Sequence, residues 1–432
     1  MTLASAVLFG TAVESRAASR EVIDRIISSI PSDWPEAPDI EAGAAILMDA
    51  ESGEILYARD ATKAMYPAST TKLMTALLTL ENSSLSDIVH FSQKAVMIPA
   101  GSSHIGMRRN EDMVLKECLY GLLLPSANEV ANALAEHVSG TIDAFVQKMN
   151  DRMHELGAVN TVFRNTNGLH HADHYTCAYD LALLMQVLCN NNVFLEIAST
   201  QSYVHHADEL LNKEIPMMNT HLMIRPSSEY YNESVVCGKT GHTTESGYNL
   251  VTYAEKDGMR LIVVVMGCES GDQYVSTQSL LDYGFHYFKP VLPAELDTSL
   301  NMENRFTASP LSIPTGEVTL LSIHSGDTIL LPDNVTFDRL EKEVNRAESG
   351  ILITYKYQGY PLGSVFLSNQ SETASPIYKD KAEAGERATD RMKNLVMIDG
   401  FLVLFLIVFA GLFVALTFYL KKRFRPRNTF RW

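Results

Sequence analysis

Ser69 and Lys72 are the first residues of this 432-residue chain whose types and spacing could do chemistry. Apolar residues with helical spacing follow them at Leu73, Ala76, Leu77 and Leu80. This pattern predicts a helix that begins at Ser69 and buries one face. Side chains three positions apart on a helix lie over one another, so the amine of Lys72 should lie beside the hydroxyl of Ser69. A serine with an adjacent amine is a nucleophile with a base, although S-x-x-K also occurs by chance in many helices.

Two physical conditions would activate this pair. Lys72 can accept a proton from Ser69 only if burial or a neighbouring positive charge depresses its pKa. The N-terminus of the helix adds backbone N–H groups that can stabilise negative charge on an attacked carbonyl oxygen. The chemistry to expect is therefore acyl transfer through a serine ester.

Two further motifs accompany S-x-x-K. Ser126 and Asn128 form an S-x-N element between two helical patterns, and Lys239, Thr240 and Gly241 form K-T-G ahead of strand-like sequence. Taken alone, Ser126 could be a helix N-cap, and Lys239 could be a surface lysine beside a turn glycine. The three motifs together match a set known from penicillin-binding proteins and class A β-lactamases.

On these motifs the chain resembles a low-molecular-mass penicillin-binding protein, a serine-type D-alanyl-D-alanine carboxypeptidase. The resemblance is close over residues 40–290 and weak over roughly the next 80. The stretches that carry it are residues 45–53, 67–81, 120–140, 165–169, 174–181 and 239–250.

The resemblance implies a role for each motif residue. Ser69 forms the acyl-enzyme, Lys72 acts as its base, and Ser126 relays protons near Lys72. Asn128 hydrogen-bonds both the substrate amide and the lysine. The implied substrate is the stem pentapeptide of peptidoglycan, β-lactam antibiotics are implied covalent inhibitors, and no cofactor is expected.

The K-T-G segment is implied to bind the terminal carboxylate. Lys239 supplies the cation, Thr240 a hydroxyl donor, and the strand that contains Gly241 can pair with the substrate backbone. The backbone N–H groups of Ser69 and His242 are implied to form the oxyanion hole.

The chain departs from the family pattern at three places. Cys237 and Gly238 stand before the K-T-G lysine, where the family usually has a hydrophobic residue directly before it, and the connection over residues 223–234 is longer than usual. Thr220 stands about where some members have an arginine that helps to hold the carboxylate. These departures bear on substrate affinity and antibiotic sensitivity.

The order of elements predicts an α+β fold, a sheet flanked by helices, and the resemblance implies that this sheet is of the penicillin-binding or β-lactamase-like type. Expected strands at residues 44–48 and 55–57, and at 248–254 and 260–267, bracket a mainly helical region, so the helical part is inserted into the sheet. A catalytic domain over residues 40–290 is followed by a small all-β domain over 293–370 and a polar stalk over 371–394.

Both ends of the chain suggest export. Residues 1–18 resemble a signal peptide that lacks a basic start, although an ordinary helix is the alternative. Residues 398–420 include twenty uncharged residues, long enough for a transmembrane helix, and the basic tail 421–432 places the C-terminus in the cytoplasm. The catalytic domain is thus expected outside a cell membrane, anchored by this single helix.

The net charge limits which partners can bind, and the cysteine count limits which disulfides can form. The formal net charge is −16, and without the six basic tail residues 29 Lys and Arg face 51 Asp and Glu, a net charge of −22. Such an acidic ectodomain would repel nucleic acid.

Five cysteines, an odd number, leave at least one thiol unpaired, so a full disulfide framework is not expected. Free thiols outside the membrane would suit a cell that lives without much oxygen.

A metal site is not expected, even though histidines gather in two places. His170, His171 and His174 lie close in sequence, and His205 and His206 follow later. None of these groups has the H-E-x-x-H spacing of a zinc site. Residues 165–169 and the segment from His174 to Thr176 resemble family stretches that hold loops around the cleft, which makes their expected role structural.

Two other functions compete with a carboxypeptidase. A class A β-lactamase needs a glutamate for its deacylating water, and the comparable residues 162–168 contain no carboxylate. The second alternative is a membrane-anchored module that binds wall peptides or β-lactams without turnover.

Overall fold

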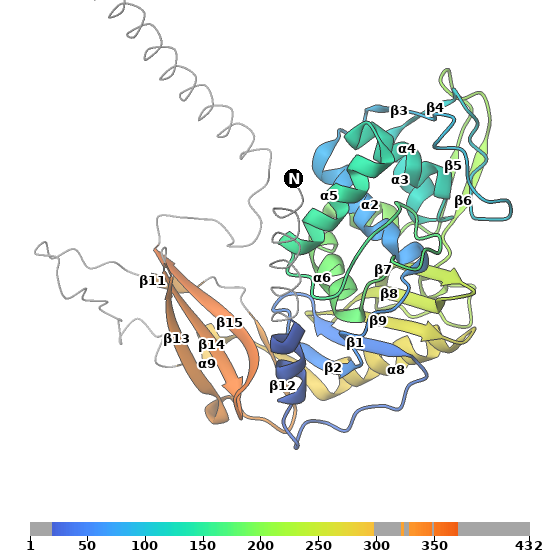
Figure 1. The fold of residues 1–432 in the computed structure, drawn as a ribbon. Coiled ribbons are helices and arrows are strands. Elements are labelled where there is room, and N and C mark those ends of the chain that lie inside the picture. The colour runs from blue at the N-terminus through green and yellow to red at the C-terminus, as the bar shows by residue number, and fades with distance from the viewer. Residues whose placement is uncertain (1–19, 298–320, 324–327, 348–349, 370–432) are drawn as a thin grey trace, which may run out of the picture. The chain divides into compact units, whose positions relative to one another are not determined.

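The computed structural model of the chain describes residues 20–297, 321–323, 328–347 and 350–369 (Figure 1). The predicted signal peptide, stalk, transmembrane helix and basic tail all lie outside these residues. Among the described residues, no single helix is long and apolar enough to cross a membrane.

An antiparallel five-stranded sheet lies at the centre of the catalytic region, in the order β2-β1-β9-β8-β7 (Figure 1). Its strands are β1 (Ala44–Asp49), β2 (Ile55–Arg59), β7 (Val235–Thr243), β8 (Gly247–Lys256) and β9 (Met259–Cys268). Because β1 pairs with β9, the two early strands join the three late ones, and the helices between β2 and β7 form an insertion. This arrangement confirms the predicted α+β sheet with an inserted helical region.

The sheet is buried on both faces, as the continuous apolar run of β9 requires. Ile262, Val264 and Met266 belong to the core on the side of the inserted helices, while Leu261, Val263 and Val265 belong to the core beneath α8 (Asp272–Tyr287). Gly284 lets α8 approach this closely, since a Cβ there would lie 2.6 Å from a methyl group of Leu261.

The inserted region contains most of the helices and two small hairpins. Its helices are η1 (Ala68–Thr71), α2 (Lys72–Asn82), α3 (Leu115–Leu123), α4 (Asn128–Ser139), α5 (Ile142–Glu155), α6 (Ala178–Leu188), α7 (Asn192–Ala198) and η2 (Leu222–Ile224). The hairpins pair β3 (Ile88–His90) with β4 (Asp112–Val114), and β5 (Ser202–His205) with β6 (Ile215–Met218). Gly140 ends α4 with a left-handed φ of 73°, a conformation that favours glycine.

The nucleophile helix begins differently from the prediction. Ser69 lies in the 3-10 turn η1, and the α-helix starts only at Lys72. The reason is local, because Ala68 has a φ of 49° and no α-helix can pass through it. The hydroxyls of Thr70 and Thr71 instead hold the turn by donating to the carbonyls of Pro67 and Ala68, at 2.9 and 2.8 Å.

Short strands follow α8, where the sequence predicts a β-rich segment. A two-stranded sheet pairs β10 (Phe288–Val291) with β12 (Ile329–Pro332), and a four-stranded sheet has the order β11-β15-β14-β13. The latter consists of β11 (Leu321–Ile323), β13 (Glu341–Ala347), β14 (Gly350–Tyr357) and β15 (Tyr360–Asn369), and the short helices α9 (Pro293–Leu296) and η5 (Phe337–Arg339) lie in the same segment. The domain boundaries drawn from the sequence stay predictions.

All five cysteines lie in the described residues, and each one is free and buried. The expectation of an incomplete disulfide framework is therefore confirmed. Burial raises the pKa of each of these thiols, which keeps them protonated and chemically quiet.

Candidate active site

Lys72 is fully buried, and its Nζ lies within hydrogen-bond distance of three oxygen atoms. These are Ser69 Oγ at 2.9 Å, Asn128 Oδ1 at 2.8 Å and the carbonyl oxygen of Asn167 at 2.7 Å. An ammonium can donate to all three. A neutral amine has two N–H groups for the amide and carbonyl oxygens, which leaves its lone pair facing the hydroxyl of Ser69. The geometry therefore suits transfer of a proton from serine to lysine.

The electrostatics favour the neutral form of this lysine. Burial lowers the pKa of Lys72 well below its ordinary value, and the positive charge of Lys239 lowers it further, while Glu129 acts in the opposite direction. The sequence argument required burial or a positive neighbour to lower the pKa of this lysine, and Lys72 has both.

The loop over residues 165–169 holds Lys72 from the other side. A Cβ on Gly168 would lie 1.7 Å from the carbonyl oxygen of Ala68, so only glycine allows the loop to meet the serine turn. The side chain of Asn165 accepts a hydrogen bond from the Gly168 N–H at 2.7 Å. This packing places the Asn167 carbonyl on Lys72, a contact that the sequence analysis missed because a backbone carbonyl leaves no side-chain signature.

Ser126 and Asn128 lie at the bend between α3 and α4, as predicted. Ser126 has a left-handed φ of 65° and is buried, and its Oγ has no hydrogen-bond partner among the described residues. The N-cap position of α4 is Ala127, without a side-chain cap, so Ser126 is not the helix cap that the sequence left open. The bend instead directs the side chain of Asn128 to Lys72, and it leaves the Ser126 hydroxyl able to hydrogen-bond another group.

Lys239 and Thr240 lie on the edge strand β7. Lys239 is only 1% exposed, which excludes the alternative of a surface lysine. Its Nζ donates to the carbonyl of Thr240 at 3.0 Å, and burial lowers the pKa of Lys239 to about 7. The hydroxyl of Thr240 lies 2.7 Å from that of Thr220, the residue that stands in place of an arginine. This end of β7 thus presents a cation and hydroxyl groups.

Gly241 and His242 bring β7 against the serine turn. A Cβ on Gly241 would lie 2.7 Å from the carbonyl oxygen of Pro67, so glycine allows the strand to pass directly beside the residues that precede Ser69. The ring of His242 stacks on Tyr248 with centroids 4.1 Å apart. The structure therefore gathers the S-x-x-K, S-x-N and K-T-G motifs around one place.

Glu129 is a residue of the site that the sequence analysis did not identify. It follows Asn128, is 2% exposed, and its Oε1 accepts from the backbone N–H groups of Ile105, Gly106 and Met107 at 2.8 to 3.4 Å. Its Oε2 has no partner among the described residues. A glutamate in a helical pattern usually faces solvent, which is why the sequence gave no reason to single it out.

His174, in the segment that was expected to hold a loop around the cleft, contacts the serine turn. His174 is buried, its Nδ1 accepts from the Arg164 N–H at 3.2 Å, and its Nε2 lies 2.9 Å from Thr71 Oγ1. Burial, assisted by His171, lowers the pKa of His174 to about 3. In the described part of the chain, metal-ligand side chains gather only at Glu117, His205 and Asp208. There His205 Nδ1 lies 2.9 Å from Glu117 Oε2, a distance that a direct hydrogen bond explains.

Comparison with known proteins agrees with this geometry. Residues 32–270 match the peptidase S11 family, described as D-alanyl-D-alanine carboxypeptidase. The chain is 29% identical over 357 residues to DacF of Bacillus subtilis, covering 80% of this chain and 87% of DacF. It is 30% identical over 303 residues to DacC of Escherichia coli, covering 67% of this chain and 73% of DacC. Both relatives are named D-alanyl-D-alanine carboxypeptidases.

Solved structures show the same fold. Penicillin-binding protein 6B of Escherichia coli aligns with a TM-score of 0.59 at 23% identity, over 79% of this chain and 99% of that one. A D-alanyl-D-alanine carboxypeptidase of Mycobacterium tuberculosis aligns with a TM-score of 0.53 at 28% identity, over 59% of this chain and 95% of that one. The resemblance seen in the sequence is confirmed, and the chain belongs to the peptidase S11 family of D-alanyl-D-alanine carboxypeptidases.

Proposed function

We propose that this chain is a membrane-anchored serine carboxypeptidase that removes the terminal D-alanine from peptidoglycan stem pentapeptides through an acyl-enzyme on Ser69. The observation that carries the proposal is the buried amine of Lys72, held by Asn128 and Asn167 with its third direction toward Ser69. Residues 398–420 and the basic tail support anchoring with the catalytic domain outside the membrane.

Acylation begins when neutral Lys72 takes the proton of Ser69 and the serine oxygen attacks the carbonyl of the last peptide bond. The negative oxygen of the tetrahedral intermediate is stabilised by the backbone N–H groups of Ser69 and His242. The C–N bond then breaks, and D-alanine leaves with a proton that Lys72 returns through the hydroxyl of Ser126. Water hydrolyses the ester by the reverse sequence of proton transfers.

Lys239 and Thr240 bind the terminal carboxylate in this scheme. The ammonium of Lys239 has one hydrogen-bond acceptor within the described residues, the Thr240 carbonyl, so it keeps donors for a ligand. The hydroxyls of Thr240 and Thr220 add neutral donors where some family members have an arginine. A β-lactam presents a carboxylate and a reactive carbonyl in similar positions, which supports covalent inhibition at Ser69.

Neither competing function is favoured by an observation. Residues 162–168 place a backbone carbonyl, and no carboxylate, next to Lys72, which does not suit the deacylation chemistry of a class A β-lactamase. A binding module without turnover would not need a serine, a buried lysine and two further motifs arranged for proton transfer.

The test is to incubate the purified ectodomain, cut after Asn394, with a stem pentapeptide and to measure free D-alanine together with labelling by a fluorescent penicillin. The parent should release D-alanine steadily and become labelled. The Ser69→Ala variant should fold, since losing a small hydroxyl at a helix start costs about 1 kcal/mol, and should do neither. A labelled band of full intensity from this variant would disprove the assignment of the nucleophile.

A further inference from the structure

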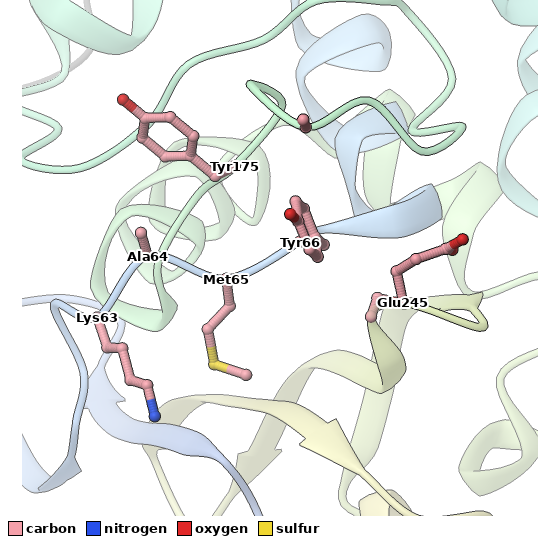
Figure 2. A pocket seen from close by; sticks show the side chains of 8 residues that line it. Lys63, Ala64, Met65, Tyr66, Tyr175 and Glu245 are labelled. Carbon is pink, nitrogen blue, oxygen red and sulfur yellow. The ribbon is translucent and has the colours of Figure 1, made fainter.

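Glu129 is a buried carboxylate to which the proposed mechanism gives no role. It lies in the first turn of α4, directly after Asn128, although most glutamates lie at the protein surface. The pocket of about 330 Å³ next to Tyr66 is lined by the segment before Ser69, the loop after Asn167 and the turn from β7 to β8, and not by Glu129 (Figure 2). The partners that the structure gives this carboxylate are instead groups of the protein itself.

These partners belong to one short loop, residues 103–107. Glu129 Oε1 accepts hydrogen bonds from three consecutive backbone N–H groups of this loop, at 2.8 to 3.4 Å. In the opposite direction, the carbonyl of Ser103 accepts a hydrogen bond from the N–H of Asn128 at 2.9 Å. The first N–H groups of a helix have no partner within the helix. The loop and the first turn of α4 therefore complete each other's backbone hydrogen bonds.

Much of this loop is exposed, so its position depends on these few polar contacts. Ser103, His104 and Gly106 are exposed, and Gly106 has a left-handed φ of 80°. The N–H of Gly106 donates to Glu129, while its carbonyl accepts from Nζ of Lys213 at 2.8 Å. Gly106 is thus held at both of its backbone polar groups, by a carboxylate on α4 and by a cation on the connection between β5 and β6.

The start of α4 is a place where the proposed reaction needs an accurate geometry. Asn128 Oδ1 lies 2.8 Å from Lys72 Nζ. Ser126, two residues earlier, has a left-handed φ of 65°, which residues other than glycine keep only where neighbouring contacts impose it. A catalytic group that is misplaced by about 1 Å can lower a rate by about a hundredfold. Contacts that fix the backbone at Asn128 therefore contribute to the reaction.

The negative charge of Glu129 does not favour the reaction by itself. It raises the pKa of Lys72 and so opposes the neutral form that accepts the proton. In addition, Glu129 Oε2 is buried without a hydrogen-bond partner among the described residues, which costs free energy. Both effects argue against a role in activating the base, and they leave the attachment of the loop as the contribution of Glu129.

We propose that Glu129 is a positioning residue of the active site, which anchors the loop over residues 103–107 to α4 so that the loop fixes Asn128 against Lys72. Glu129 acts through Asn128, and the proton transfers remain with Ser69, Lys72 and Ser126. This inference rests on the proposed function, because it assigns a role within that reaction.

The test is acylation of the full-length protein by a fluorescent penicillin, measured as the maximal rate and as the penicillin concentration that gives half of that rate. Glu129→Gln keeps the shape of the side chain and one acceptor oxygen, but it removes the charge that strengthens three hydrogen bonds. The maximal rate should fall by about ten- to a hundredfold. The half-saturating concentration should change little, since Lys239 and Thr240 are untouched. A higher half-saturating concentration with an unchanged maximal rate would assign Glu129 to ligand binding and overturn the proposal.

Glu136→Gln is the matched control. Glu136 lies about two turns further along α4 and accepts a hydrogen bond from Ser92 Oγ at 2.6 Å, so it also ties this helix to an earlier segment of the chain. Its replacement removes the same charge from the same helix and should leave the maximal rate close to that of the parent. A loss as large as that of Glu129→Gln would contradict a specific role for the loop over residues 103–107.

A double-mutant cycle with Asn128→Ala separates positioning from a general loss of stability. If Glu129 acts through Asn128, Glu129→Gln should lower the rate little further in a protein that already lacks the Asn128 side chain. An undiminished loss in that background would refute the positioning role. Lys213→Gln loosens the same loop at the carbonyl of Gly106 without altering α4. It should show the same pattern with a smaller loss, and it carries the test if circular dichroism shows that Glu129→Gln does not fold.

Failure of the proposed function gives a different result. If the parent is not labelled by penicillin and releases no D-alanine from a stem pentapeptide, the carboxypeptidase assignment itself fails, whatever the variants do. If the parent does both and the loss in Glu129→Gln is independent of Asn128, only the positioning role fails.

Discussion

Two buried lysines stand a short distance apart in this protein, and their surroundings differ in one respect. Lys72 is fully buried and has three oxygen acceptors within 2.9 Å, two of them an amide and a carbonyl that do not ionise. Lys239 is 1% exposed, and in the described part of the chain its one hydrogen-bond acceptor is the carbonyl of Thr240. Burial lowers the pKa of both.

In the proposed function, this difference in hydrogen bonding lets the same type of side chain serve two purposes. A lysine whose donors are already occupied by neutral acceptors can exchange its remaining proton with a serine, and its geometry survives the loss of charge. A lysine with unused donors has to find an anion, and a substrate carboxylate meets that need. In the proposed mechanism, hydrogen bonding, more than burial, therefore separates the base from the anion receptor.

Replacing each lysine by arginine should reduce activity far more at Lys72 than at Lys239. Arginine stays charged and cannot accept the proton of Ser69, so we expect Lys72→Arg to slow penicillin acylation by roughly 10²- to 10⁴-fold. Lys239→Arg keeps the charge that the carboxylate needs and should retain part of the activity. The smaller Lys72→Gln covers the case in which arginine does not fit, and circular dichroism checks folding. A Lys72→Gln protein that acylates within tenfold of the parent would show that Lys72 is not the base.

Removing the charge at position 239 should have the next largest effect. Lys239→Ala loses a charge-assisted contact of about 1.5–3 kcal/mol, which corresponds to roughly ten- to a hundredfold in kcat/KM. A peptide with an amidated C-terminus should be poor for the parent and lose little more on the variant. The four rates form a double-mutant cycle between lysine and carboxylate. An equal loss for both peptides would mean that the two groups are not coupled.

The sequence predicted the parts of this site that depend on side-chain type and spacing. The S-x-x-K, S-x-N and K-T-G residues could be named because each must supply a specific group, and the strand at residues 260–267 could be predicted from its apolar run. The carbonyl of Asn167 could not be found, since any residue supplies one. Glu129 was missed because its burial depends on a loop some twenty residues earlier in the chain, whose path no local pattern encodes.

The start of the nucleophile helix was mispredicted for a related reason. Periodicity placed Ser69 in the first α-helical turn, but the left-handed Ala68 forces a 3-10 turn there. That conformation depends on the close contacts with Gly168 and with β7 at Gly241, both far away in sequence. Spacing gave the correct neighbours for Ser69, while tertiary contacts decided the geometry of the turn.

The pH dependence of kcat/KM should distinguish the two lysines, because the proposed mechanism needs them in opposite protonation states. In the proposed mechanism, activity requires neutral Lys72 and charged Lys239. For a peptide with a free carboxylate, kcat/KM should therefore rise as Lys72 loses its proton and fall as the pH passes the Lys239 pKa of about 7, by up to about tenfold per pH unit. The amidated peptide does not need the charge of Lys239, so its rate should lack the falling limb. The same fall for both peptides would assign that limb to another group.

The smallest expected effect is on stability, and it should have opposite signs at the two lysines. Lys239→Met replaces a buried cation that has few hydrogen-bond acceptors by an apolar chain of similar length, so it should raise the free energy of unfolding by about 1–2 kcal/mol at pH 6. Lys72→Met also removes three hydrogen bonds, so it should lower the free energy of unfolding. The pKa of Lys239 in the folded state lies below its value in the unfolded state. The free-energy cost of burying its charge is therefore present in full below about pH 7, and it disappears as the pH rises toward about 10.5. The advantage of Lys239→Met in urea unfolding should therefore be largest at pH 6 and smaller at pH 9. An advantage that grows with pH would mean that Lys239 is well satisfied without substrate, and the distinction between the two lysines would be lost.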